Sequence, residues 1–171
     1  MSPLTLVRAG TDAIPTIMRF ERQPGYEVLV GRWSEAEHAR AMADPGTVYL
    51  LGCEDGTPRG SAMLLGLDNP HGNILLRRIV VEQAGQGFGR RFFLAVVDWV
   101  FTTTLAHRLW LTVLETNARA HHVYRTSGFR DDGMQRESFV RPDGQRVSQY
   151  LMSMLRPEWE ARQGRPAAES K

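Results

Sequence analysis

The sequence predicts a single α/β domain built on a mixed but mostly antiparallel sheet of about six to seven strands, flanked by about four helices. The chain has 171 residues, 42% of them hydrophobic and 23% charged, which is typical of one globular domain with its own core. Short alternating segments separated by turn-forming residues predict the strands, and stretches with helical spacing of apolar residues predict the helices. We expect the domain to cover residues 1–156 and a polar tail, residues 157–171, to pack loosely.

In the N-terminal half, the sequence predicts one strand, two short helices and an antiparallel meander of three strands. A strand is expected over Leu4–Arg8, and a short helix from Thr11 toward Phe20. A second helix opens at Ser34, which has Glu37 at the spacing of a capping box. Two strong turn sequences then divide an antiparallel meander into three strands. These strands are expected over residues 47–52, 59–67 and 73–81.

The C-terminal half alternates helices with strands. A glycine-rich turn leads into a helix with an apolar stripe along one face. The stripe consists of Phe88, Phe92, Val96, Trp99 and Val100. Next come a strand over residues 109–114 and a helix over residues 118–127, which Gly128 ends. Two last strands are expected near residues 130–140 and 147–155, around a hairpin turn.

The basic residues exclude several kinds of chemistry. Twenty of the 21 basic residues are arginine, and the one lysine is Lys171. Schiff-base enzymes, pyridoxal-phosphate enzymes and phosphate-binding P-loops all need an internal lysine, so these classes are excluded. The arginines are scattered among 19 acids with a net charge of +2, which argues against a nucleic-acid partner. Cys53 stands alone, so we expect neither a disulfide nor a metal site.

The apolar segments of the chain are short. A membrane-spanning helix needs about 18 consecutive apolar residues, and no run in this sequence approaches that length. Residues 1–10 also lack the apolar segment of a signal peptide. We therefore expect a cytoplasmic protein with no membrane partner.

A glycine-rich turn between a strand and a helix is the first feature with chemical meaning. Gly85, Gly87 and Gly89 place bare backbone N–H groups at a helix N-terminus, where anions bind. Arg90 and Arg91 would add charge-assisted contacts to a phosphate. The spacing matches neither a Rossmann turn nor a Walker loop. The turn predicts a pyrophosphate site made mainly of main chain, with purely steric glycines as the alternative.

A second pattern follows about thirty residues later. Asn117 stands at a strand-to-helix junction and Tyr124 lies seven residues on, so both side chains share one helical face. A plain helix cap for Asn117 and a half-buried core position for Tyr124 would also explain the pair.

Together, the two patterns resemble the GNAT superfamily of N-acetyltransferases, and the resemblance covers nearly the whole chain. Several segments are similar to its ribosomal-protein N-terminal acetyltransferase branch and the bacterial relatives of that branch. These segments are Leu109-Trp110-Leu111, Asn117-Ala118-Arg119-Ala120, Tyr124, Gly128-Phe129 and Leu151-Met152-Ser153-Met154-Leu155. The resemblance implies one GNAT-like domain that holds acetyl-CoA, without a metal, between two splayed parallel strands. It also implies a possible homodimer, since many relatives pair.

The resemblance implies a role for each residue of the site. The main chain of Ile79, Val80 and Val81 would pair with pantetheine, and an N–H near Val81 would bind the acetyl carbonyl. The residues implied to hold the pyrophosphate are Gln86, Gly87, Phe88, Gly89, Arg90 and Arg91. Asn117 would form a hydrogen bond with the pantetheine part of acetyl-CoA. Tyr124 would protonate the leaving thiolate, because a phenol of pKa about 10 is a usable proton source for a thiol of pKa about 8.5.

The chain departs from the family pattern at three places. Ala84 stands where the motif usually begins with Arg or Gln. Leu75 and Leu76 occupy the strand where relatives often carry Glu. Thr112 stands at the position where the ribosomal-protein branch has its general base, so that base is missing here. The general base is therefore unassigned.

Three residues are candidates for the base. Glu115 follows the strand that lacks the family acid, Glu27 lies in the loop on the acceptor side, and His71 is in the turn before the cofactor strand. Each is also explained as an ordinary surface residue. An α-amine of pKa about 8 is partly neutral already and needs less help than a lysine side chain.

These observations predict an N-acetyltransferase that uses acetyl-CoA and a direct attack in a ternary complex. The acceptor would be a primary amine, on either a protein or peptide N-terminus or a small molecule. The alternative is a non-catalytic acyl-CoA-binding or regulatory module on the same fold, which Ala84 and the missing strand acids would suit.

Overall fold

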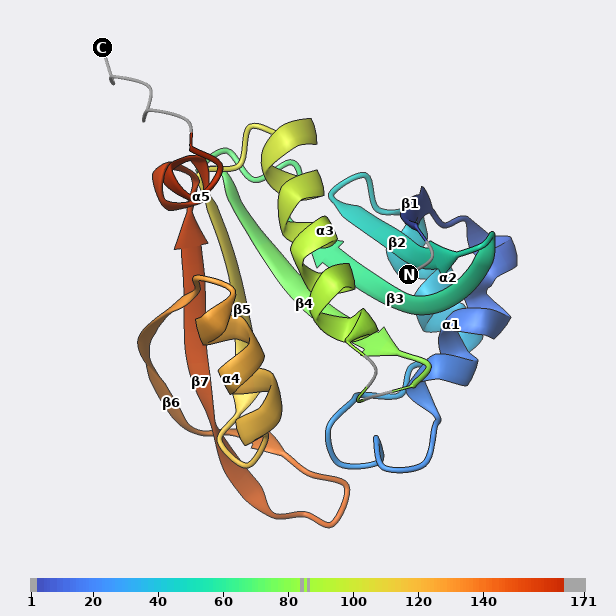
Figure 1. Cartoon of the computed structure of the whole chain (residues 1–171). Helices are drawn as coiled ribbons and strands as arrows, with labels where there is room; N and C mark the ends of the chain where they lie inside the picture. Colours follow the sequence, from blue (N-terminus) through green and yellow to red (C-terminus); the bar gives the residue numbers. More distant parts are fainter. Residues whose placement is uncertain (1–2, 84, 86, 165–171) are drawn as a thin grey trace.

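A twisted seven-stranded sheet with helices on both faces forms the frame of the molecule (Figure 1). The computed structural model describes residues 3–83, 85 and 87–164. The strands are β1 (Leu4–Arg8), β2 (Thr47–Glu54), β3 (Thr57–Leu65), β4 (Asn73–Val81), β5 (Arg108–Leu114), β6 (Arg130–Val140) and β7 (Arg146–Leu155). The helices are α1 (Ile14–Glu21), α2 (Glu35–Ala43), α3 (Phe88–Thr103), α4 (Ala118–Thr126) and α5 (Arg156–Arg162), with a 3-10 turn over Thr11–Ala13. The expected α/β class and strand number are confirmed.

The sheet opens between its two middle strands. Strand order is β1-β2-β3-β4-β5-β7-β6, and every pair is antiparallel except the parallel pair β4–β5. That pair is in register only where Asn73, Ile74 and Leu75 face Arg108, Leu109 and Trp110. Beyond this point β4 and β5 diverge, while β5 stays paired with β7 along its whole length (Figure 1). The expected splayed parallel pair is confirmed, and it leaves the second half of β4 without a strand on its β5 side.

A β-bulge interrupts β4 inside the open region. Arg78 faces Met63 on β3, and Leu76 faces Leu64, so Arg77 has no counterpart on β3. A bulge of this kind bends the strand and turns consecutive side chains toward one side. It brings two neighbouring arginines to the opening of the sheet.

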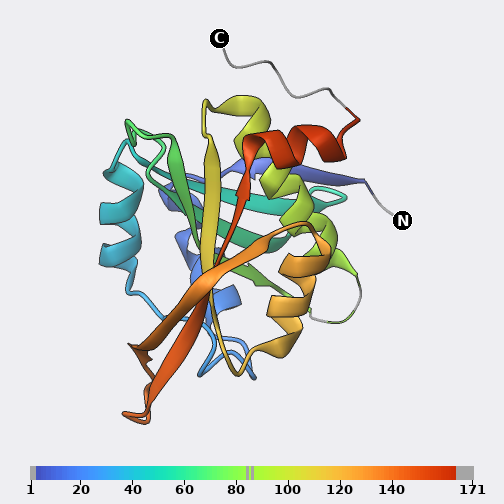
Figure 2. The same cartoon turned by 90° about the vertical axis from the view of Figure 1, so that its left-hand side faces the viewer.

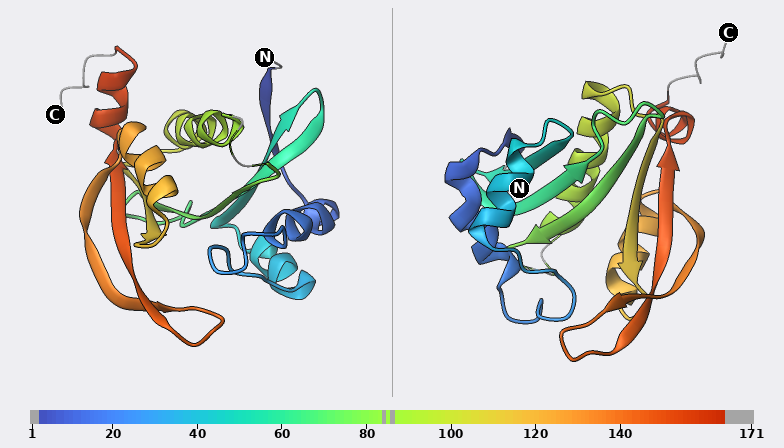
Figure 3. Two further views of the ribbon diagram at one scale, coloured as in Figure 1. Left: turned by 60° about the horizontal axis from the view of Figure 1, so that its bottom comes forward. Right: turned by 180° about the vertical axis from the view of Figure 1, so that it is seen from behind.

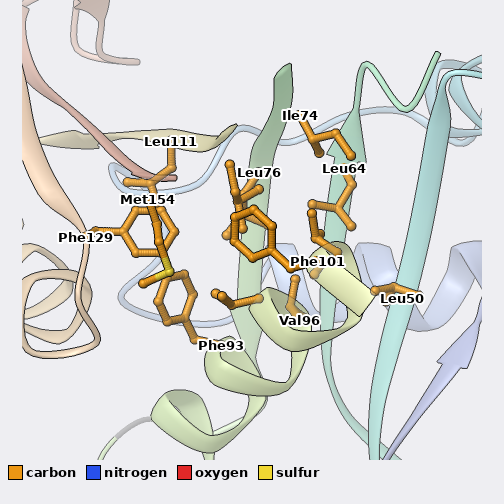
Figure 4. Packing of buried hydrophobic residues seen from close by; sticks show 14 of the residues in the cluster. Leu50, Leu64, Ile74, Leu76, Phe93, Val96, Phe101, Leu111, Phe129 and Met154 are labelled. Atoms are coloured by element: carbon orange, nitrogen blue, oxygen red, sulfur yellow. The ribbon is translucent and has the colours of Figure 1, made fainter. Parts of the chain in front are cut away.

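Apolar faces of α3 and the sheet form the main core. Helices α3 and α4 lie on one face of the sheet, and α1 and α2 on the other (Figures 2 and 3). Phe93 and Val96 of α3 pack toward Leu76 of β4 and Leu111 of β5, which lie on the two sides of the opening (Figure 4). Burying one such side chain contributes about 1.5–3 kcal/mol, so the cluster holds the two diverging halves of the sheet together.

The expected loose packing of the C-terminal segment is wrong for residues 157–162, which belong to α5. Trp159 is buried, stacks on Phe101 with ring centroids 5.5 Å apart, and donates from its indole N–H to Asp98 Oδ1 at 2.7 Å. Arg156 donates to the carbonyls of Phe101 and Ala106 at 2.7 and 2.8 Å. This helix therefore closes one end of the core and caps the last turn of α3.

Candidate active site

A cavity of about 420 Å³ lies where β4 and β5 diverge. Ile79 and Val81 of β4 form one wall, and Thr112 of β5 with residues of α4 forms another. The loop between α1 and α2 supplies Tyr26, and the strands β6 and β7 supply side chains from the hairpin side. This loop and the β6–β7 hairpin lie at the same end of the molecule (Figures 1 and 3). The open sheet thus becomes a site reached by several elements.

The glycine turn borders one end of this cavity. Gly85 and Gly87 both line it with left-handed backbone, at φ 101° and 79°, a conformation that favours glycine. Helix α3 begins directly afterwards, so its first N–H groups have no carbonyl partner within the helix. Gly89 and Arg90 line the same end. The turn has the backbone geometry of an anion site.

Other residues expected in the donor site lie elsewhere or have other partners. Phe88 and Val80 are buried, and Phe88 stacks on Phe92 with ring centroids 5.7 Å apart, so neither side chain lines the cavity. Arg91 donates to Glu54 Oε1 on β2 at 2.8 Å. Gln86, like Ala84, lies outside the described residues.

Asn117, the N-cap residue of α4, and Tyr124 within this helix both line the cavity and so lie on one side, as their spacing predicted. Asn117 Oδ1 accepts a hydrogen bond from the N–H of Ala120 at 3.2 Å. The helix cap and the place in the site, which the sequence presented as alternatives, therefore coexist in Asn117. No described residue accepts a hydrogen bond from its amide NH₂ group, which can therefore bind a ligand.

The phenol of Tyr124 is held in an aromatic setting. Its ring lies 4.8 Å from the ring of Phe93 and 6.5 Å from that of Phe129, measured between centroids. Burial raises the pKa of Tyr124 to about 12. The hydroxyl is therefore protonated at any pH near neutrality, as a proton donor must be.

No carboxylate or imidazole lines the cavity among the residues that the structure describes. Glu27 is exposed, and its carboxylate accepts from the N–H of Gly25 at 2.8 Å. Glu115 is also exposed and accepts from the N–H of Ser148 at 3.1 Å. His71 lies in the exposed turn before β4. The structure brings none of the three candidate bases to the site.

The charged groups that do line the cavity are arginines: Arg77, Arg78, Arg90 and Arg119. Arg78 forms an ion pair with Glu21, whose side chain is fully buried behind it. Partial burial, and then the charge of Arg78, lower the pKa of Arg77, although this guanidinium stays protonated at neutral pH.

Sequence reasoning missed the polar cluster behind Arg78. Glu21 Oε2 lies 3.2 Å from Nε2 of the buried His38, whose Nδ1 lies 2.9 Å from the hydroxyl of Tyr49. The guanidinium of Arg78 stacks over Trp33, 5.0 Å from the ring centroid. These groups come from α1, α2, β2, β4 and a loop, and only the tertiary fold brings them together.

Sequence reasoning also missed two contacts to the main chain of β4. The Tyr26 hydroxyl and the Gln23 side-chain amide donate to the carbonyl of Val81 at 3.0 and 3.3 Å. The loop after α1, which was expected on the acceptor side, thus contributes Tyr26 to the cavity wall.

Comparison with known proteins agrees with this geometry. A model of the acetyltransferase (GNAT) family matches residues 14–129, well over half of the chain. The chain belongs to the GNAT family of acetyltransferases. It is an N-acetyltransferase that uses acetyl-CoA as its acetyl donor.

Relatives of this GNAT acetyltransferase include the spermidine N(1)-acetyltransferase of Escherichia coli K12, 26% identical over 131 residues, covering 75% of the chain and 69% of the relative. A solved spermidine N-acetyltransferase from Vibrio cholerae is 21% identical with a TM-score of 0.81, covering 94% and 98%. A complex of the Vibrio enzyme with CoA and spermine is 20% identical with a TM-score of 0.81, covering 91% and 97%. These structures share the fold.

These relatives give no support to the narrower similarity to the ribosomal-protein branch, because they are named as spermidine acetyltransferases. One solved Vibrio structure is described as dodecameric, at 21% identity and a TM-score of 0.79 over 93% of the chain and 97% of that structure. A homodimer of this GNAT acetyltransferase stays a prediction. In the described part of the chain, no helix is long and apolar enough to cross a membrane, and no cluster of side chains suits a metal ion.

Proposed function

We propose that the protein transfers the acetyl group of acetyl-CoA to a primary amine of a small molecule, by direct attack in a ternary complex. The observation that carries the proposal is the cavity at the β4–β5 opening, with the glycine turn at one end and Tyr124 in its wall. The name of the Escherichia coli relative supports a small amine as acceptor, since spermidine is one.

Acetyl-CoA would bind along the unpaired edge of β4. The segment Ile79, Val80 and Val81 is paired with β3 on one edge, and its main-chain groups that point to the other edge are offered there, because β5 has moved away. The Val81 carbonyl already accepts from Tyr26 and Gln23, so Val81 would contribute its N–H. The donors offered to the pyrophosphate are the N–H groups of Gly87, Phe88 and Gly89 and the side chain of Arg90. Arg91 would hold the start of α3 against β2 through Glu54. Asn117 would donate to the pantetheine with its amide.

The acceptor amine would attack the acetyl carbonyl, and a backbone N–H near Val81 would stabilise the negative oxygen that forms. Collapse of this intermediate breaks the carbon–sulfur bond and releases the CoA thiolate. The nitrogen loses its extra proton to water as the amide forms, Tyr124 would donate its proton to that sulfur, and water would then reprotonate Tyr124. The same burial that raises the pKa of Tyr124 also makes a thiolate beside it more basic, so the proton transfer stays feasible.

Deprotonation of the amine needs an explanation, because neither Glu27 nor Glu115 reaches the cavity. A positive charge beside an ammonium group disfavours its charged form and lowers its pKa. Arg77 lines the cavity and provides such a charge. We propose that the amine loses its proton to water and enters the reaction neutral.

The proposal is tested by incubating the protein with acetyl-CoA and a panel of primary amines, with mass spectrometry of the products and calorimetry of CoA binding. Acetylated amine together with stoichiometric CoA release is the expected result. CoA binding without any acetylated product across the panel would contradict acetyl transfer and favour the non-catalytic module.

A further inference from the structure

The half of the cavity that faces away from α3 has a distinct composition. Leu111 and Val113 of β5 are buried in the core on the α3 side, so Thr112 between them faces the opposite side. Gln149 of β7 donates to the Thr112 hydroxyl at 3.1 Å and lines the cavity with Phe139 of β6. We call this region, with Arg77 and Arg78, the acceptor pocket. It consists of residues Arg77, Arg78, Thr112, Phe139 and Gln149.

The two arginines of the acceptor pocket differ in their partners. Arg78 pairs with the buried carboxylate of Glu21, so its charge is compensated within the protein. Arg77 is the unpaired residue of the β4 bulge, and no acidic side chain among the described residues pairs with it. The other members of the pocket are uncharged. The pocket therefore carries one uncompensated positive charge at the opening of the sheet.

Such a pocket is poorly matched to a polycation. A protonated polyamine would place like charges beside Arg77, and no described carboxylate of the cavity would offset that repulsion. A carboxylate or phosphate group would instead receive two parallel N–H bonds from the planar guanidinium.

We propose that the acceptor is a small molecule that carries an acidic group, a carboxylate or a phosphate, near its primary amine, and that Arg77 binds this acidic group. The inference rests on the proposed acetyl transfer and specifies its substrate class. It also fits the lack of a base in the cavity. Pairing with Arg77 neutralises the acidic group, which would otherwise keep the neighbouring amine protonated.

The experiment compares matched acceptors. Each α-amino acid of a panel is assayed beside its α-amide, its aminophosphonate analogue serves as the phosphate arm, and spermidine serves as the polycation arm. We expect kcat/KM for the acid to exceed that for the amide by about tenfold or more, since a hydrogen-bonded charge pair is worth at least this ratio. Arg77→Gln should remove this preference for the acid, and Arg77→Lys, which keeps the positive charge, should retain part of it. Arg40→Gln, an exposed arginine on α2 outside the cavity, keeps it.

A binding arm keeps the result independent of turnover. Calorimetry of the CoA complex with each N-acetyl amino acid and its N-acetyl amide should show the same preference, lost in Arg77→Gln. Equal binding of acid and amide, or tighter binding of the amide or of spermidine, overturns the inference. Acetylation of spermidine without any acid overturns it while leaving acetyl transfer intact. A preference for acids in binding without any product supports Arg77 and contradicts acetyl transfer.

Discussion

The Tyr124 hydroxyl combines two properties that a proton donor to a thiolate needs. It lines the same cavity as the open edge of β4, and its pKa of about 12 keeps it protonated. The ring is fixed by Phe93 and Phe129, so loss of the hydroxyl need not disturb the packing.

Replacing Tyr124 by phenylalanine should lower kcat by about 100-fold or more, the usual contribution of a general acid. The KM for acetyl-CoA should change little, because the ring that packs against Phe93 is kept. Steady-state kinetics under conditions where chemistry limits the rate provide the measurement. The control is Tyr150→Phe, a tyrosine of β7 outside the cavity. An unchanged kcat in the Tyr124 variant would remove the acid role.

At the scale of an element, the glycine turn before α3 is the phosphate site that we propose. Gly87 precedes α3 with φ 79°, and Gly144 in the β6–β7 turn has φ 81°. A Cβ at either position meets no heavy atom within 4 Å, so the two positions impose the same backbone strain and differ in location.

Alanine at either glycine should lower the free energy of unfolding by about 1–2 kcal/mol, the strain of a left-handed non-glycine residue. Only Gly87→Ala should also raise the KM for acetyl-CoA, by about tenfold, because its methyl group enters the cavity at the pyrophosphate site that we propose. Denaturant unfolding and donor titration check both parts. If Gly144→Ala raised the KM for acetyl-CoA as much as Gly87→Ala does, the glycine turn before α3 would have no special role in binding.

Helix α5 is a second element with a measurable effect. Trp159→Ala should lower the free energy of unfolding by about 3–5 kcal/mol, because it empties the space against Phe101 and removes the bond to Asp98. Trp159→Phe keeps the stacking and should lose about 1 kcal/mol. Urea unfolding of both variants gives the comparison, and equal stability of Trp159→Ala and the unmodified chain would show that α5 is dispensable.

Local patterns in the sequence predicted the strands, four of the five helices and the family. The capping box of Ser34 and Glu37 is an example, since both of its hydrogen bonds form. Helix α5 was missed because Trp159 is the one large apolar side chain among its seven residues, so no apolar stripe marks it. The Pro157 and Glu158 pair at its start was the available signal.

The acceptor side of the site could not be predicted. The bulge at Arg77 is a property of pairing between β3 and β4, and the Arg78–Glu21 pair joins residues 57 positions apart. No local spacing encodes such contacts, whereas the residues that we propose for the donor site lie on two short motifs that sequence patterns reveal.

At the scale of the whole molecule, the stability of the fold depends on pH through two tyrosines, the buried Tyr49 and the partly buried Tyr124 of the site. The pKa of Tyr124 and of Tyr49 is raised from 10 to about 12 by burial. Above pH 10 the unfolded chain loses these protons first, so the contribution of the two tyrosines to the free energy of unfolding should be complete below pH 10 and fall as the pH rises toward 12. Tyr124→Phe should reduce this fall, as followed by chemical denaturation at several pH values. An identical fall in the variant would contradict the raised pKa.

The splayed sheet is the feature on which the whole account depends, because it exposes the main chain of β4 to acetyl-CoA. Hydrogen exchange of the full chain, with and without acetyl-CoA, tests this directly. We expect slower exchange in peptides that contain residues 79–81 and the first turn of α3, with no change in β1 on the far edge of the sheet. Slowed exchange in β1, or none at residues 79–81 and the start of α3 under saturating acetyl-CoA, would contradict a donor site between β4 and β5.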